Sequence, residues 1–445
     1  MAITDQDATT HVRRRNALTP RQVGFAAMIG NAIELYDFIL YSFIAASVFG
    51  PLFFPSFEPW LGTLAAFSGH AVAFLIRPLG ATVFGRMGDR LGRRPALLAS
   101  LAIMGVATVG IGLLPTYAAI GVAAPVILVA LRMLQGLAVG GEYPGAVVVA
   151  VEHAPPRLAT LYGAFPQIGN MIGILSAGAS MLIVNLVVGQ ATWQAWGWRV
   201  PFLLSGVLVV IGLLLRTRLS ETPEFVEASS KAAAQRRAAS GQFSTLLRRA
   251  RRPLLICVLM WIGPVTFGYA FLTSLLAYVG KYQPELSAAD VQLGLVLTGL
   301  ALVVLVAVSG RYGDAWGRER IVIISGVLTM AWAIPSYLLI GTGDRYALWL
   351  AMTVGAISYG IFGGVVPTMM SHLFPVEVRY VGVATVIAIS ALVGGGLLPL
   401  PTLAAVGSLG GSPVPMMTMM GLSGLATTIG GVLLHRNRLV LHATR

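Results

Sequence analysis

Long apolar segments alternate with short polar connections along almost the whole chain. Most of these segments hold about the 20 residues that an α-helix needs to cross the hydrocarbon core of a bilayer. A spanning segment must be helical here, because lipid offers backbone groups no hydrogen-bond partner. The pattern predicts twelve transmembrane helices, with limits near 24–49, 60–83, 95–114, 122–150, 160–188, 200–215, 253–279, 290–309, 321–341, 346–370, 380–400 and 412–434.

One long polar insertion divides these helices into two sets of six. Residues 216–252 carry nine basic residues and three glutamates. The end of this insertion is typical either of a short amphipathic helix on the membrane surface or of a partly ordered tether. The predicted organisation is a cytoplasmic N-terminal segment at 1–23, a six-helix bundle at 24–215, a cytoplasmic linker at 216–252, a second six-helix bundle at 253–434 and a cytoplasmic tail at 435–445.

A short motif recurs in the two sets, 225 residues apart: GRMGDRLGRR at Gly85–Arg94 and GRYGDAWGRER at Gly310–Arg320. Glycines permit a tight turn, and an aspartate among arginines can hold neighbouring helix ends together. A duplicated unit with a substrate site between its copies is typical of secondary transporters. We therefore expect a gate at one membrane face, formed by Asp89, Arg90, Arg93, Asp314 and Arg318, with ion pairs nearby from Glu152, Arg157, Glu377 and Arg379.

Composition agrees with a membrane protein and excludes several other classes. Of the 445 residues, 56% are hydrophobic and 11% are charged, and the mean hydropathy is +0.81, whereas a soluble domain carries roughly 25% charged residues. The single cysteine, Cys257, excludes a disulfide scaffold or a cysteine-ligated metal site. The sequence contains no histidine, cysteine and carboxylate cluster with ligand spacing. We therefore predict no enzymatic activity, no metal and no cofactor other than the proton gradient.

Membrane topology explains the net charge of +13. Of the 30 lysines and arginines, 25 fall in the N-terminal segment, in the connections on one side of the predicted bundle, or in the tail. Basic loops stay in the cytoplasm, so both termini are expected to face the cytoplasm from a multi-pass position in the inner (plasma) membrane. The basic residues then attract anionic lipids, and no nucleic-acid partner is expected.

The paired loops resemble the signature of the major facilitator superfamily. Finer features resemble its metabolite:proton symporter family, which includes proline/betaine, α-ketoglutarate, citrate and shikimate transporters, and this resemblance extends over nearly the whole chain. It implies an all-α integral membrane protein with twelve transmembrane helices in two pseudo-symmetric six-helix bundles. Ala315 and Glu319 depart from the pattern of the first loop, which indicates a weaker latch in the second half. The matching stretches are Gly30–Phe43, Phe74–Arg94, Arg132–Ala146, Trp196–Gly206, Leu219–Phe225 and Phe374–Gly382.

Ionisable residues inside apolar segments are costly in lipid and point to function. At 100° per residue, Asn31, Glu34, Asp37 and Tyr41 share one face of the first helix, and Arg132 shares a face of the fourth with its polar neighbours. We expect these faces to point at one another or at a water-filled cavity. The ionisable residues all lie in the first half: Glu34, Asp37, His70, Arg77, Arg132 and Glu142.

The chemistry of these side chains suggests separate roles. A guanidinium group binds a carboxylate through paired hydrogen bonds, so Arg132 and then Arg77 are the main substrate-binding candidates. Dehydration raises the pKa of a carboxyl group and a nearby arginine lowers it, which would let Asp37, Glu34 or Glu142 couple proton uptake to substrate binding, with His70 as a further candidate. The alternative is that these charges only hold helices together. Polar side chains that can bind substrate or cross-link helices are Asn31, Tyr36, Tyr41, Gln135, Gln167 and Asn170.

Together these features predict a secondary transporter that functions as a monomer and imports a small organic acid with protons by alternating access. Two buried arginines favour a carboxylate as the substrate. The alternative substrate is a zwitterionic osmolyte such as betaine or proline. An exporter of the same fold is a further alternative.

Overall fold

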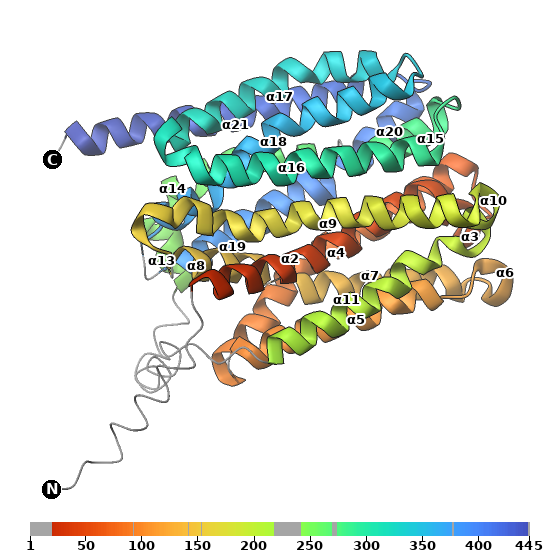
Figure 1. The fold of residues 1–445 in the computed structure, drawn as a ribbon, viewed down its shortest axis with the longest axis horizontal. Coiled ribbons are helices and arrows are strands. Elements are labelled where there is room, and N and C mark those ends of the chain that lie inside the picture. Colours follow the sequence, from red (N-terminus) through yellow and green to blue (C-terminus); the bar gives the residue numbers. More distant parts are fainter. Residues whose placement is uncertain are drawn as a thin grey trace, which may run out of the picture.

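The structure is a computed structural model that describes residues 20–91, 93–140, 142–152, 154–217, 242–268, 274–375 and 378–443. Within these ranges every regular element is a helix. Most helices run side by side along the long axis of the molecule, with the first half of the chain below and the second half above in the view of Figure 1. In the described part of the chain, nine helices are long and apolar enough to cross a membrane, and one bent pair makes a tenth candidate.

The first half of the chain accounts for the first six predicted membrane segments. Its helices are α2 (Pro20–Ile44), continued by the π-helical turn η1 (Ala45–Phe49) and α3 (Gly50–Phe53), α4 (Pro59–Leu91), α5 (Arg93–Leu113), α6 (Tyr117–Ile120), α7 (Ala123–Val139), α8 (Glu142–Glu152), η2 (Pro156–Leu158), α9 (Ala159–Val188), α10 (Gln190–Thr192), η3 (Trp193–Gly197) and α11 (Arg199–Thr217).

The second half contains the counterparts of the remaining six. Its helices are α13 (Gln242–Arg249), α14 (Arg251–Thr266), α15 (Leu275–Tyr282), α16 (Ala288–Trp316), α17 (Arg318–Ile340), α18 (Arg345–Leu373), α19 (Arg379–Ser390), the π-helical segment η7 (Ala391–Leu397), α20 (Pro399–Ser408) and α21 (Val414–Ala443).

Some helix limits differ from the prediction. The sixth segment, expected at 200–215, is preceded by a helical stretch at Gln190–Gly197 that is bent by 59° from Arg199–Leu214. The eleventh segment, expected at 380–400, continues through η7 to Ser408. Pro399 does not stop this helix, because it stands in the first turn of α20, directly after the π-helical segment, where a proline is tolerated.

The last part of the predicted linker is helical. In α13 the side chain of Leu246 is fully buried, whereas those of Leu247, Arg248 and Arg249 are exposed. The helix packs against α14 and α19. Its apolar side therefore covers the bundle. Residues 218–241 of the predicted linker lie outside the described residues, and the predicted domain boundaries stay predictions.

Helices α4 and α7 approach each other backbone to backbone. A Cβ added at Gly136 of α7 would overlap the backbone carbonyl of Ala73, and one added at Gly80 of α4 would overlap that of Leu137. Small residues allow membrane helices this kind of contact. The close approach is what brings Arg132 of α7 alongside the polar residues of α4.

We expect Gly136→Ala to lower the free energy of unfolding by about 1–3 kcal/mol, because the added methyl group must push α4 and α7 apart. The measurement is the thermal unfolding midpoint of the purified protein in detergent. Gly421→Ala is the matched control, since Gly421 also lies in a membrane helix and no atom lies within 4 Å of its added Cβ. Equal midpoints for Gly136→Ala and the natural chain would contradict the contact.

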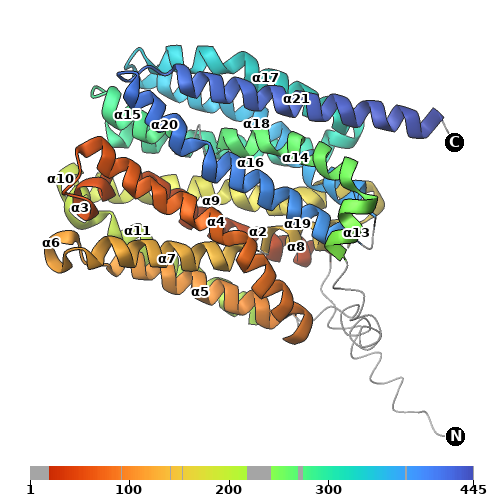
Figure 2. The same cartoon turned by 180° about the vertical axis from the view of Figure 1, so that it is seen from behind.

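The two halves meet mainly through helices α9 and α4 of the first half. In the first half α9 packs against α16 and α18, and α4 packs against η7 and α20 of the second half. Figures 1 and 2 both show α9 running beside α16. These helices form the boundary across which the halves would move in the alternating-access cycle that the sequence predicts.

The halves touch at both ends of the bundle. At the end where α9 begins and α16 ends, which we call the basic end, Thr160 donates a 2.7 Å hydrogen bond to Asp314. At the opposite end the ring of Trp60 packs 5.8 Å from that of Tyr282, and Gly407 leaves room for the Trp60 indole. This conformation therefore brings the halves into contact at both ends.

Candidate functional site

Four buried polar and charged side chains and one half-buried arginine, Arg77, lie together inside the first half. Asp37 belongs to α2, His70 and Arg77 to α4, and Arg132 and Gln135 to α7. Asp37 is 1% exposed and Arg132 is 2% exposed. We call these five residues the charged cluster. The arrangement agrees with the sequence prediction that the polar faces of the first and fourth helices point at one another.

Several contacts hold the guanidinium group of Arg132 in place. Its Nη1 donates to Gln135 Oε1 at 2.8 Å and its Nε donates to the Gly69 carbonyl at 3.4 Å. The guanidinium carbon lies 3.7 Å from the centre of the Tyr41 ring, and the Tyr41 hydroxyl donates to the Ala66 carbonyl at 3.0 Å. These bonds and the cation–π contact compensate for burying a positive charge.

His70 is a neutral member of the charged cluster in this arrangement. Its Nδ1 lies 3.3 Å from Arg132 Nη2. Arginine can only donate, so Nδ1 must accept and the imidazole carries its single proton on Nε2. The rings of Phe38 and Phe74 lie 4.1 Å and 5.5 Å from the imidazole. An additional proton on His70 would place a second positive charge against Arg132.

Thr108 of α5 connects Arg132 to Asp37 through Gln135. Because Arg132 must donate to Gln135 Oε1, the Gln135 amide nitrogen faces the other way and donates to Thr108 Oγ1 at 2.7 Å. The same Thr108 oxygen lies 2.7 Å from Asp37 Oδ2. An unbroken series of polar contacts thus joins the buried arginine to the buried acid.

The number of protons available at Thr108 constrains the state of Asp37. A hydroxyl group has one proton to donate and two lone pairs. Thr108 Oγ1 also lies 3.0 Å from the Met104 carbonyl, which can only accept. A carboxylate at Asp37 would compete with Met104 for that one proton. A protonated Asp37 would donate to Thr108 instead, and all three contacts of Thr108 Oγ1, with Gln135, Asp37 and Met104, would then be satisfied.

A small cavity lies beside these contacts. Its volume is about 10 Å³, near the lower limit for one water molecule, so no substrate-sized molecule fits in this conformation. Arg77 Nε is buried and has no hydrogen-bond partner among the described residues. The cavity is lined by Glu34, Asp37, Phe38, Ala73, Arg77, Met104, Arg132, Gln135, Gly136 and Val139. Where the chain is described, no three metal-ligating side chains lie together.

A second polar group, which we call the interface cluster, joins the two halves. Gln167 Oε1 accepts from the Tyr143 hydroxyl at 2.8 Å and from Asn170 Nδ2 at 3.2 Å. Gln167 Nε2 donates to the hydroxyl of Tyr359, on α18 of the other half, at 3.2 Å. The ring of Trp261 lies 6.3 Å from that of Tyr143. The interface cluster consists of these five residues, and none of them is charged.

Two predicted binding residues lie away from both clusters. Asn31 Nδ2 donates to the Ala27 carbonyl of its own helix at 2.7 Å. The Tyr36 hydroxyl bonds to Ser180 and to the Pro201 carbonyl, at 3.0 Å and 2.9 Å. Both side chains therefore serve contacts within the first half in this conformation.

The predicted gate residues are described only in part. Asp314 accepts hydrogen bonds from Thr160 of the first half and from Arg318 of its own helix. Glu152 forms a 3.1 Å ion pair with Arg379 of the second half. The side chain of Arg157 instead lines a cleft at the basic end. The side chains of Asp89, Arg90, Arg93, Glu142 and Glu377 lie outside the described residues.

Sequence reasoning missed several residues that the structure places in these clusters. Thr108 carried no signal, because a threonine in an apolar helix usually bonds to its own backbone. Trp261 looked like any lipid-facing aromatic residue. Tyr359 lies in the second half, whose predicted membrane segments carry no charged residue away from their ends that would draw attention to it. The helical arc shared by Tyr143 and Arg132 was the one available clue to the interface cluster.

An all-helical bundle of two halves, with a buried charged cluster in one half and a polar boundary between the halves, is typical of a membrane transporter. The sequence pattern of the Major Facilitator Superfamily matches residues 38–399, and the chain belongs to that superfamily. It is a transporter and not an enzyme. The predicted twelve-helix, all-α membrane fold is confirmed.

Similar proteins agree with this assignment. The chain is 36% identical to the inner membrane metabolite transport protein YhjE of Escherichia coli (strain K12), over 84% of this chain and 85% of that one. It is 33% identical to the proline/betaine transporter of Salmonella typhimurium, over 85% and 76% of the two chains. It is 32% identical to the shikimate transporter of Escherichia coli (strain K12), over 85% and 86%. These relatives support a multi-pass position in the inner membrane.

The fold is also similar to that of solved structures. The proton:xylose symporter XylE of E. coli superposes with a TM-score of 0.72, covering 94% of this chain and 95% of its own. The two sequences are 15% identical. At that level the likeness extends to the fold alone.

Proposed function

We propose that this chain is a proton-coupled symporter that imports a small organic carboxylate, with both termini in the cytoplasm. One observation carries the proposal: the polar contacts from Arg132 to Asp37 are all satisfied when Asp37 holds a proton. Asp37 is then the proton carrier, and Arg132 is the residue that responds to its charge.

The charge balance of the cavity supports coupling of the proton to an anion. The described side chains that line it include two arginines and two acids. Among these described side chains, with His70 neutral and Asp37 protonated, Glu34 is the one acid left to balance two arginines. An unbalanced positive charge in the low-dielectric interior is costly. A carboxylate would remove that cost, and Arg77 Nε has a buried proton to donate. Proton binding and anion binding would therefore favour each other.

The substrate would reach the charged cluster from the boundary between the halves. Phe74 stands between the two: its ring lies 4.2 Å from the Arg77 guanidinium carbon, and a Cβ on Gly396 of the second half would lie 3.0 Å from the Cβ of Phe74. Separation of α4 from η7 would free this ring. The interface cluster would then hold the substrate while Arg77 and Arg132 attract its carboxylate.

A zwitterionic osmolyte is the second candidate substrate. Tyr143, Trp261 and Tyr359 present aromatic rings at the interface cluster, and aromatic faces attract quaternary ammonium groups. The proline/betaine transporters among the relatives support this candidate, as the shikimate transporter supports the carboxylate. Export instead of import is tested by reversing the proton gradient across vesicles.

A thermal-shift screen of the purified protein tests the proposal. The panel holds mono-, di- and tricarboxylates, betaine and proline, each at acidic and at neutral pH. We expect one carboxylate to raise the unfolding midpoint, and more at acidic pH, because a ligand that binds only the folded state stabilises it by about 2.7 kcal/mol at 100 times its Kd. Asp37→Asn should keep the shift and lose its pH dependence.

The other outcomes of the screen separate the candidates. A shift with betaine or proline alone would replace the carboxylate by the zwitterion. A carboxylate shift of equal size at both pH values would contradict the coupling of the proton to the anion. If the ligand-induced shift of Asp37→Asn kept its full pH dependence, Asp37 would not be the proton carrier.

A further inference from the structure

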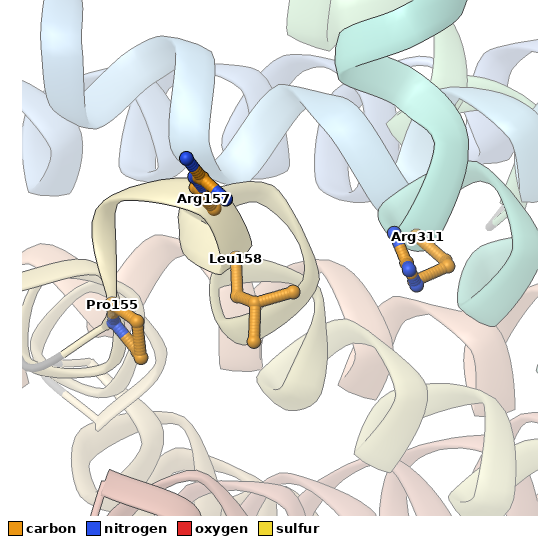
Figure 3. Close-up of a pocket in the computed structure, with 4 residues that line it drawn as sticks. All are labelled: Pro155, Arg157, Leu158 and Arg311. Carbon is orange, nitrogen blue, oxygen red and sulfur yellow. The ribbon is translucent and has the colours of Figure 1, made fainter.

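A cleft with a volume of about 790 Å³ opens at the basic end. Pro155, Arg157 and Leu158 line it from the turn that precedes α9, and Arg311 lines it from α16 of the other half (Figure 3). Both arginine side chains are exposed. The cleft therefore presents one cation from each half of the transporter.

The carboxylates nearest in sequence to these arginines have other partners. Asp314 binds Thr160 and Arg318, and Glu152 binds Arg379. In the part of the chain that the structure describes, neither Arg157 nor Arg311 forms an ion pair. Two guanidinium groups of like charge thus share a cleft, and neither has a carboxylate partner among the described residues.

Helix packing fixes the two arginines relative to each other. Arg157 lies three residues before Thr160, and Arg311 lies three residues before Asp314, so the 2.7 Å Thr160–Asp314 hydrogen bond forms next to the cleft. A Cβ on Gly310 would lie only 2.8 Å from the Cβ of Ala164, which shows how closely α9 and α16 approach here. The arginines face a common cleft only while the halves touch at this end.

We propose that Arg157 and Arg311 form a phosphate-binding clamp that stabilises the closed basic end. Without an anion, closure brings two positive charges together and is opposed by their repulsion. A phosphate group between them replaces this repulsion with two charge-assisted contacts, since guanidinium groups match phosphate oxygens in pairs. The cleft is much larger than one phosphate ion, so it accepts the headgroup of an anionic phospholipid as well as dissolved phosphate.

The test measures closure of the basic end directly. Spin labels at Pro95→Cys and Trp316→Cys, both exposed positions in different halves, report the distance between α5 and α16. The protein is reconstituted in nanodiscs of phosphatidylcholine, with or without phosphatidylglycerol, and separately with inorganic phosphate. We expect an anionic probe to increase the short-distance population. The variant R157Q/R311Q should need at least about tenfold more probe, because each basic residue contributes about a factor of five near an anionic surface.

Arg320→Gln is the matched control, because Arg320 is an exposed arginine at the same end that does not line the cleft. It should respond like the natural chain. Closure by phosphatidylglycerol alone would assign the clamp to a lipid headgroup, and closure by inorganic phosphate would assign it to the dissolved ion. No response to either probe, or an equal loss in Arg320→Gln, would overturn the proposal. The single variants R157Q and R311Q keep the test valid if the double variant is unstable.

Discussion

Replacing Asp37 by asparagine is expected to abolish proton-driven accumulation of substrate while exchange across the membrane continues. The amide has nearly the size of the carboxyl group and carries no charge at any pH. Its Nδ2 can donate to Thr108 Oγ1, as the protonated acid would over the observed 2.7 Å. The variant therefore imitates the protonated state permanently. It should bind and exchange substrate but have no proton to release.

Proteoliposomes measure both activities. For one coupled proton, each unit of pH gradient drives about tenfold accumulation, because one unit corresponds to about 1.36 kcal/mol. Asp37→Asn should reduce the accumulation ratio to about one, with counterflow close to that of the natural chain. Glu34→Gln is the companion variant, since Glu34 lines the same cavity. If Asp37→Asn accumulates substrate normally and Glu34→Gln does not, the proton carrier is Glu34 and not Asp37.

The fold was predictable because its strongest signals are lengths and charges. Apolar segments of about 20 residues can only be helices in lipid. The predicted helix ends were wrong where helical structure extends beyond the predicted apolar segment. Examples are Pro399, in the first turn of α20, and the stretch Gln190–Gly197, which bends by 59° before α11.

The charged cluster was predictable because burying an ionisable group in an apolar helix is costly and is retained for a reason. Neutral polar residues lack this signal. Asn31 occupies the same face as Asp37 but bonds to its own helix, at Ala27. Thr108 bonds to its own helix as well, at Met104, and yet it also meets Gln135 and Asp37. The sequence treats Asn31 and Thr108 alike, and only the packing of α5 against α7 shows that Thr108 also contacts another helix.

Arg132→Lys is expected to retain the positive charge and lose most of the transport activity. The guanidinium group donates to Gln135, to Gly69 and toward His70 from one plane that also stacks on Tyr41. A lysine ammonium is a point charge that cannot reproduce this planar arrangement. A hydrogen bond to a charged group contributes about 1.5–3 kcal/mol, so losing one should slow uptake roughly tenfold to hundredfold.

Arg199→Lys separates a role in transport from a role in holding helices together. Arg199 also stacks on an aromatic ring, with its guanidinium carbon 4.4 Å from the centre of Trp198, and donates to the carbonyls of Gly112 and Leu114. It lies outside the charged cluster, so Arg199→Lys should lower the unfolding midpoint and keep proton-coupled uptake. If Arg132 only linked helices, Arg132→Lys would behave in the same way. The two variants remove comparable contacts, so they should destabilise the protein to a similar degree. If Arg132→Lys loses uptake while its unfolding midpoint is no lower than that of Arg199→Lys, Arg132 takes part in transport itself.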